Sequence, residues 1–221
     1  MPRLAGGNPS SRQPRISYFV MAKIPTLTAA ALRQAEIHLA AADPVMAGLI
    51  ERHGPCRLKP RPGDPFTILA SSIIGQQLSL KAADTIEARV LAHLGGAFTP
   101  AAVLALPHET LRAAGLSNAK VRYLHALASH AESGQVDFAG LKRYPDDEIM
   151  AALLPIPGVG RWTVEMFLIF GLGRTDVLSP GDGGLQRAAA ALYPRKTMEK
   201  AAEKWRPWRS VGCWYLWRSL G

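Results

Sequence analysis

The sequence predicts an all-α protein, and three observations carry that prediction. From Thr26 onward apolar residues recur at helical spacing, helix-start signals precede the apolar runs, and no segment alternates polar and apolar residues as a strand would. The chain has 221 residues, of which 48% are hydrophobic and only 19% charged. This composition suits one or two compact domains with a sizeable core.

The first helices can be followed from their boundary residues. Thr28–Asp43 is rich in alanine and leucine, which are strong helix formers. Asp43 is suited to cap a second helix, with Pro44 at its first position and Gly54 at its end. Asp64–Pro65 repeats this start signal before the apolar run PFTILASSIIGQQ.

The later helices follow the same rules. Ser79 is suited to cap a helix that closes at Gly95–Gly96, and Asp146 starts another. The other predicted helices are Pro100–Leu106, His108–Gly115, Asn118–Ser133, Arg161–Leu172, Leu185–Tyr193 and Met198–Leu220.

The first residues do not fit this helical pattern. Residues 1–25 are rich in Pro, Gly, Ser and Arg, and they lack the apolar run of a secretory signal. We expect a disordered extension, with Met1 or Met21 as the start of translation; a transit peptide is the alternative. Residues 26–221 are then expected to form the folded core.

Charge and cysteine content narrow the choice of partners. Lys and Arg outnumber Asp and Glu by 26 to 17, a net charge of +9, which fits a polyanionic partner and equally a merely basic protein. Two cysteines cannot form a four-thiolate site, and the six histidines show no metal-ligand spacing, so no catalytic metal is expected. No apolar stretch is long enough for a membrane span.

A glycine-containing turn is the first candidate site. In LPIPGVGRWTVEMFLIF, from Leu154 to Phe170, Pro157 cannot extend the preceding helix, and Gly158 and Gly160 permit dihedrals that other residues avoid. The next helix would start with free N–H groups beside Arg161, where a phosphate can approach. A plain helix-helix corner needs the same glycines, so both interpretations stay open on these residues alone.

A single aspartate follows in LSPGDGGLQ. Asp182 precedes a helical run and is suited to cap it. A fixed carboxylate can also stabilise the positive charge that develops on a sugar when a glycosidic bond breaks. Asp176 and Glu165 are the alternative acids nearby, and on these residues alone the cap is the favoured interpretation of Asp182.

Several motifs in order resemble one enzyme family. The glycine turn followed by DVLSPGDGGLQRA, the upstream DPFTILASSIIGQQLSLKAADTI, the middle LSNAKVRYLHALA and the late AEKWRPWRSVGCWYLW are similar to the helix-hairpin-helix (HhH-GPD) DNA glycosylase superfamily. The resemblance runs from about Asp43 to Leu220. It is greatest for the alkylation-repair branch, 3-methyladenine DNA glycosylase II.

The resemblance implies a fold and an activity. Two helical subdomains would enclose the active-site cleft, without the N-terminal β domain that some relatives carry. The expected activity is base-excision repair of double-stranded DNA, by hydrolysis of the N-glycosidic bond of flipped-out alkylated purines of the 3-methyladenine type. The alternatives are a non-catalytic helix-hairpin-helix module that binds damaged DNA and a glycosylase for another damaged or mispaired base.

The resemblance also assigns site residues. Asp182 would be catalytic, and the hairpin Gly158, Val159, Gly160 and Arg161 would bind a DNA phosphate, with a Na⁺ or K⁺ ion on its carbonyls. Trp162 stands where lyase-type relatives carry a lysine, so water is the expected nucleophile and an abasic site the product.

The base pocket and the wedge complete the implied site. Trp162, Met166 and Trp217 would line the pocket, although core packing explains tryptophans equally well. Gln77 or Leu78, in the turn IGQQLS, would fill the gap left by the flipped base, whereas Gln76 is better explained by a hydrogen bond between helices.

The remaining expectations concern cofactors, assembly and location. We expect no cofactor and no iron–sulfur cluster, a monomer with no membrane partner, and a cytoplasmic location, at the nucleoid in a bacterium or in the nucleus of a eukaryote. Gly183 and Gly184 replace the apolar residues often found after the aspartate, which leaves the positioning of Asp182 open.

Overall fold

The computed structural model describes residues 24–221, and this part of the chain is all-α, as predicted. It forms helices and no sheet; an isolated bridge pairs Thr26 with Arg174. The predicted extension over residues 1–25 lies, except for its last two residues, outside the described residues. No helix within residues 24–221 is long and apolar enough to cross a membrane.

The helices follow one another with short connections. They are α1 (Ala29–Ala42), α2 (Pro44–His53), α3 (Pro65–Gly75), α4 (Leu80–His93), α5 (Pro100–Ala105), α6 (His108–Ala113), α7 (Asn118–Glu132), the 3₁₀ turn η1 (Leu141–Arg143), α8 (Asp146–Leu153), α9 (Arg161–Met166), the π-helical turn η2 (Phe167–Gly171), α10 (Gly183–Leu192), α11 (Met198–Ala202), the 3₁₀ turn η3 (Glu203–Trp205) and α12 (Arg209–Arg218).

The predicted start signals are confirmed by the geometry of the caps. The side chain of Asp43 accepts a hydrogen bond from the N–H of Val45 at 3.0 Å, and Asp64 caps α3 in the same way. Ser79 caps α4 through the N–H of Ala82. Each cap satisfies an N–H group that the first helical turn leaves without a partner.

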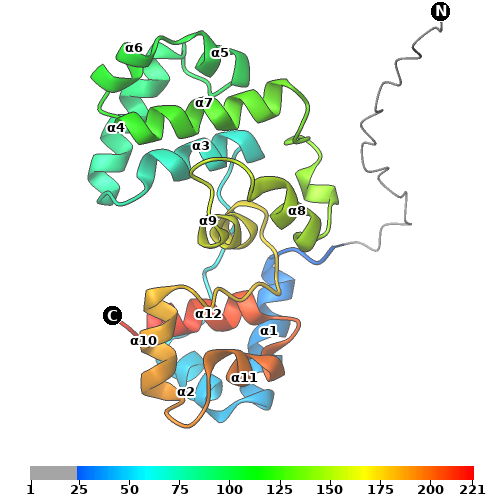
Figure 1. The fold of residues 1–221 in the computed structure, drawn as a ribbon. Coiled ribbons are helices and arrows are strands. Elements are labelled where there is room, and N and C mark those ends of the chain that lie inside the picture. Colours follow the sequence, from blue (N-terminus) through cyan, green and yellow to red (C-terminus); the bar gives the residue numbers. More distant parts are fainter. Residues whose placement is uncertain (1–23) are drawn as a thin grey trace, which may run out of the picture.

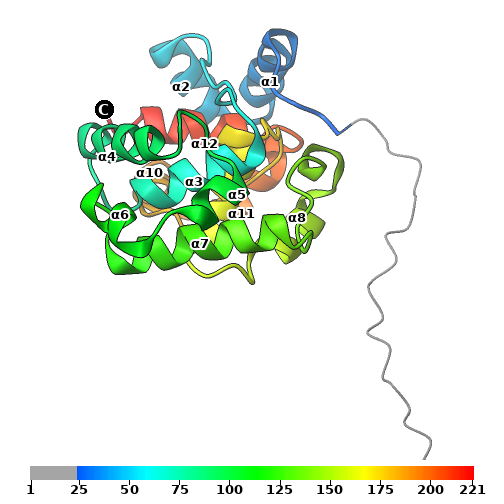
Figure 2. The ribbon, with the colours of Figure 1, turned by 90° about the horizontal axis from the view of Figure 1, so that it is seen from above.

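Two groups of helices make up the molecule (Figure 1). The first and last parts of the chain, α1, α2 and α10 to α12, pack together in one group, while α3 to α8 form the other. The view from above looks onto the second group, with α1 and α2 of the first group at its edge (Figure 2). This confirms the predicted arrangement of two helical subdomains.

The segment between α2 and α3 and the residues before α1 both lie beside the end of η2. The N–H of Arg61, before α3, donates to the carbonyl of Phe170 at 2.7 Å. The N–H of Leu27, before α1, donates to the carbonyl of Gly173 at 2.8 Å. The chain thus crosses between the groups next to η2, which places the end of the α9–η2 segment near the junction.

Two predicted helices are wrong in their extent. The predicted helix Met198–Leu220 is interrupted between η3 and α12, because Pro207 has no N–H for a helical bond and disfavours the helical conformation of Arg206. The predicted helix Arg161–Leu172 is regular only to Met166. It then widens, and the N–H of Leu172 bonds to the carbonyl of Phe167 at 2.9 Å.

Candidate functional site

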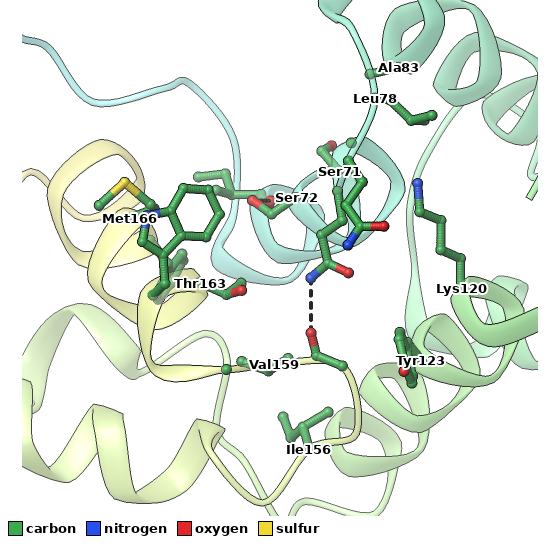
Figure 3. Close-up of a pocket in the computed structure, with 18 of the residues that line it drawn as sticks. Ser71, Ser72, Leu78, Ala83, Lys120, Tyr123, Ile156, Val159, Thr163 and Met166 are labelled. Atoms are coloured by element: carbon green, nitrogen blue, oxygen red, sulfur yellow. Dashed lines mark hydrogen bonds between the residues drawn. The ribbon is translucent and has the colours of Figure 1, made fainter. Parts of the chain in front are cut away.

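A cavity of about 1330 Å³ lies between α3, α4 and α7 of the second helix group and the segment that runs from Leu154 through α9 to η2. Its walls come from the end of α3, the start of α7, the segment from Leu154 to Gly160, and α9 with η2. Figure 3 shows Ser72, Trp162's neighbour Thr163 and Met166 on one side, with Lys120 and Tyr123 on the other. The sequence-predicted hairpin and wedge therefore border the same cavity.

The hairpin connects α8 to α9, and one of its glycines is required by geometry. Gly158 has a φ of +84°, which a side chain rarely adopts. A Cβ atom on Gly158 would also lie 2.2 Å from the ring of Tyr123. Val159, next to it, is buried and anchors the turn in the core.

Gly160 is not required by its backbone conformation, unlike Gly158. Its backbone is ordinary and extended, with φ −90° and ψ 170°, so the expectation of an unusual conformation is wrong for this residue. A Cβ atom on Gly160 would meet nothing within 4 Å. What the glycine leaves is open space in front of the helix.

The start of α9 presents N–H groups to that space. Within residues 24–221, the N–H groups of Gly160, Arg161, Trp162 and Thr163 donate no hydrogen bond, and no side chain caps the helix. The side chain of Arg161 is 68% exposed beside them. Unpaired N–H groups and a guanidinium at an exposed helix start can bind a phosphate oxygen.

The wedge turn after α3 faces the hairpin across the cavity. Gln77 has a φ of +57°, an unfavourable conformation for a residue other than glycine, and Leu78 is 39% exposed. Both line the cavity. A residue in a strained conformation at an exposed turn is typical of functional sites.

Two side chains hold this turn in place through hydrogen bonds to backbone carbonyls. The amide of Gln76 donates to the carbonyl of Gly158 at 2.9 Å, the dashed line of Figure 3, which confirms its expected role between helices. The ammonium of Lys120 donates to the carbonyl of Ile74 at 2.7 Å. Burial lowers the pKa of Lys120.

Asp182 is both a helix cap and the acceptor for two indoles. Its Oδ1 accepts from the N–H of Leu185 at 2.8 Å, which caps α10, and from Nε1 of Trp217 at 3.0 Å. Its Oδ2 accepts from Nε1 of Trp162 at 2.8 Å. Burial acts to raise the pKa of Asp182, but these hydrogen bonds and one from the Gly184 N–H outweigh it and lower the pKa.

The predicted pocket residues occupy different places. Trp162 and Met166 line the cavity, and Trp162 is 48% exposed, which is unusual for a core tryptophan. Trp217 lies behind the lining, with its ring centroid 5.7 Å from that of Phe170, which does line the cavity. Asp182 also lies outside the lining, and Trp162 connects it to the cavity.

The two alternative acids are engaged elsewhere. Asp176 forms ion pairs with Arg206 at 2.9 Å and Arg209 at 2.7 Å. Glu165 lies on the buried face of α9, where it accepts a hydrogen bond from Ser179 at 2.6 Å. Of the three acids, Asp182 is the one that the structure joins to the cavity.

Sequence reasoning did not identify Lys120, Tyr123 or Phe170. Lys120 and Tyr123 are three residues apart, which places them on one face of α7, and this spacing is a signal that could have been used. The contact of Tyr123 with the hairpin has no local signal. In the sequence, Phe170 cannot be distinguished from the other apolar residues of the run MFLIF.

The hairpin between two helices, with free N–H groups at its exposed end, defines a helix-hairpin-helix protein. Residues 70–210 match the family described as "HhH-GPD superfamily base excision DNA repair protein". The chain is 30% identical over 197 residues to the alkylbase DNA glycosidase-like protein mag2 of Schizosaccharomyces pombe, over 84% of this chain and 92% of the relative.

Two solved structures are similar in fold and sequence. A DNA-3-methyladenine glycosidase from Bacillus halodurans matches with a TM-score of 0.77 and 40% identity, over 84% of this chain and 89% of that chain. The 3-methyladenine DNA glycosylase Mag1 of Schizosaccharomyces pombe, solved in complex with abasic DNA, matches with a TM-score of 0.71 and 31% identity, over 84% and 96%. The chain belongs to the HhH-GPD superfamily of base excision DNA repair proteins.

Two hairpin carbonyls keep acceptor capacity of the kind that the cation implied by the resemblance would use. The carbonyl of Ile156 accepts the N–H of Val159 at 3.0 Å, and that of Gly158 accepts from Gln76, so each keeps a second lone pair. Carbonyl oxygens are the donors that hard cations prefer.

Proposed function

We propose that this protein is a monofunctional DNA glycosylase that removes alkylated purines, of the 3-methyladenine type, from double-stranded DNA by hydrolysis. The observation that carries the proposal is the half-exposed Trp162, which lines the cavity with its ring and binds Asp182 through its N–H at 2.8 Å. A base seated against this ring would bring its sugar toward the carboxylate. The names of the relatives given above support the same class of substrate.

The base side of the cavity suits an electron-poor purine. Trp162, Met166 and Phe170 offer apolar and aromatic surface, and a cationic alkylated base stacks favourably on an indole face. Ser72 and Thr163 add hydroxyl groups at the edge. Such a pocket favours bases that stack well and leave the duplex at a low cost.

The carboxylate of Asp182 is best suited to an electrostatic role. Breaking the N-glycosidic bond builds positive charge on the sugar, and a fixed carboxylate stabilises it. A general base works best when its pKa lies near the working pH, whereas the pKa of Asp182 is lowered. We therefore assign Asp182 the stabilisation of the sugar cation and the orientation of the attacking water.

Trp162 stands where lyase-type relatives carry a lysine, and this determines the nucleophile. With no amine there, no Schiff base forms with the sugar, and water completes the reaction to leave an abasic site. Borohydride should therefore trap no covalent protein–DNA adduct. A trapped adduct would show a lyase activity and contradict this step.

DNA is held by the hairpin and entered by the wedge. The free N–H groups of α9 and Arg161 bind one phosphate, while Gln77 or Leu78 fills the gap in the duplex. The hairpin carbonyls would hold a Na⁺ or K⁺ ion, whose charge favours the same phosphate. The reaction needs no other cofactor, and one chain supplies the whole site, which supports a monomer. The protein would act where the chromosome lies, in a nucleoid or a nucleus.

The test is base release from methylated DNA. The wild type should release 3-methyladenine or 7-methylguanine, and Asp182→Asn should be slower by at least about 100-fold, because it removes the fixed charge. Binding to DNA with an abasic-site analogue should survive the substitution. A wild type that binds abasic DNA but releases no base would instead be the non-catalytic module; release of other damaged or mispaired bases alone would show a different substrate.

A further inference from the structure

Glu165 is a buried acid outside the cavity lining that the proposed mechanism does not use. It lies on α9, one turn after Trp162, and its side chain is 5% exposed. Taking a carboxylate out of water costs several kcal/mol unless partners compensate it. An apolar side chain at this position would avoid that cost, so the partners of Glu165 indicate what the acid is used for.

The principal partner is on the segment that carries Asp182. Ser179, which is fully buried, donates its hydroxyl to Oε2 of Glu165 at 2.6 Å. The carbonyl of Ser179 in turn accepts the N–H of Asp182 at 3.1 Å. Glu165 is therefore connected to the backbone of Asp182 through one residue.

A second attachment joins the same helix to the side chain of Asp182. Nε1 of Trp162 donates to Oδ2 of that carboxylate at 2.8 Å. Helix α9 thus holds the Asp182 segment at two points, the backbone through Glu165 and the carboxylate through Trp162. The Leu185 N–H and Trp217 hold Oδ1, so the bond of Ser179 to Glu165 adds a constraint on the backbone from which the carboxylate projects.

The other contact of Glu165 contributes less. Arg161 approaches Oε1 at 3.8 Å, but its side chain is 68% exposed, and water screens such a pair. The buried bond to Ser179 is therefore the relevant interaction. Burial raises the pKa of Glu165, the Ser179 hydroxyl and Arg161 act to lower it, and the negative charge of Asp182 adds to the rise.

We propose that Glu165 is a positioning residue, which through Ser179 fixes the Asp182 carboxylate relative to the hairpin and the base pocket. The proposal rests on the function proposed above. It also explains how Asp182 can be held despite Gly183 and Gly184, since the constraint comes from the residues before the aspartate. Glu165 touches no substrate, because its side chain is buried and does not line the cavity.

The experiment combines turnover with a signal that needs no turnover. Glu165→Ala and Ser179→Ala should each lower kcat for base release by about 10- to 100-fold, the cost of misplacing a catalytic group by about 1 Å. The Kd for DNA with an abasic-site analogue should change by less than about two-fold. The double variant should be no slower than the slower single variant, because both remove one interaction. Glu165→Gln keeps an acceptor oxygen for Ser179 and should restore most of kcat.

The second signal is the ¹⁵N–¹H resonance of the Trp162 indole, assigned by its loss in Trp162→Phe. In Glu165→Ala and Ser179→Ala this resonance should shift and its N–H should exchange faster, because the bond to Asp182 is weakened. Glu36→Ala is the matched control, since Glu36 is a half-buried acid that accepts from Cys56 N and Tyr215 Oη in the other helix group. It should lower the unfolding midpoint but leave kcat and the indole signal unchanged.

Three results would overturn the proposal or separate it from the proposed function. An unmoved indole signal in Glu165→Ala and Ser179→Ala overturns it whatever the activity. A kcat loss in Glu36→Ala equal to that in Glu165→Ala reduces Glu165 to a structural residue. A wild type without base release, in which both variants still shift the indole signal, rejects the proposed function and keeps Glu165 as the residue that positions Asp182.

Discussion

At the scale of single residues, Asp182 shows that a helix cap and a reactive carboxylate can be the same group. The cap and Trp217 use both lone pairs of Oδ1, whereas Trp162 uses one of Oδ2, so Oδ2 still has an acceptor site for a sugar or a water. Because three N–H donors favour the charged form, the side chain remains ionised wherever an ordinary aspartate does.

The indole of Trp217 should contribute to this charge state. Trp217→Phe keeps an aromatic ring beside Phe170 but removes the N–H that binds Oδ1, so the pKa of Asp182 should rise. A lowered pKa preserves the carboxylate until the pH falls through that value, and a higher pKa brings its protonation to a higher pH. A ¹³C NMR titration of the carboxyl carbon measures the change. An identical titration in both proteins would show that this hydrogen bond is absent in solution.

At the scale of elements, the hairpin offers a matched pair of glycines. Gly158→Ala should lower the free energy of unfolding by about 2–4 kcal/mol, because φ is positive and the new methyl meets Tyr123. Gly160→Ala should change stability by less than about 0.5 kcal/mol, since its dihedrals suit alanine and its Cβ meets nothing.

DNA binding by the folded protein should be weakened by Gly160→Ala, although this substitution hardly changes stability. Gly160→Ala places a methyl where a phosphate must approach, and should raise the Kd for abasic-analogue DNA by about ten-fold, near 1.4 kcal/mol. Urea unfolding and a fluorescence binding assay measure the two effects. If Gly160→Ala binds as tightly as the wild type, the hairpin is only a helix-helix corner.

The wedge turn should show a conflict between stability and function. Gln77→Gly relieves a positive φ and should raise the free energy of unfolding by about 0.5–1 kcal/mol. The same change removes the side chain that enters the duplex, so base release should slow although the free energy of unfolding rises. Thermal unfolding and single-turnover base release are the measurements. A variant that is both more stable and equally fast would transfer the wedge role to Leu78.

At the scale of the whole molecule, the features of the fold and the site that could be predicted are those that a short stretch of sequence determines. The cap residues Asp43, Asp64 and Ser79, the turn at Gly158 and the aspartate before α10 are all marked by short patterns of residues. Contacts between distant segments carry no such pattern. Trp217 lies 35 residues from Asp182, and the hydrogen bond between them exists only because α12 packs against α10.

The same reason explains the shortened helix before Leu172 and the burial of Glu165, which the sequence analysis names only as an alternative to Asp182. Leu172 follows a turn whose widening depends on packing, and Glu165 looks on sequence like any polar residue on a helix. Pro207 is the exception, since its effect on Met198–Leu220 is local and could have been predicted.

Asp43 ties the beginning of the chain to its end and should control the stability of the whole molecule. Besides capping α2, its Oδ2 accepts from the Tyr193 hydroxyl at 2.8 Å and from Trp205 Nε1 at 2.9 Å, and Lys204 pairs with Oδ1 at 3.2 Å. Burial acts to raise its pKa, and the hydrogen bonds from these partners and from Val45 lower it overall. Asp43→Ala should lower the free energy of unfolding by about 3–5 kcal/mol, because it leaves buried donors and a charge without a partner.

Asp64 is the matched control for this prediction, because it caps α3 with the same start signal but is exposed and binds nothing distant. Asp64→Ala should cost only about 1 kcal/mol, the usual value of a cap. Since the folded pKa of Asp43 is lowered, its contribution is present above the unfolded value and is lost as the pH falls through the folded one. Asp43→Asn should therefore make stability less dependent on pH below about 4. Urea unfolding from pH 7 to pH 3 tests both points, and equal losses in Asp43→Ala and Asp64→Ala would mean that the bonds between the chain ends add nothing.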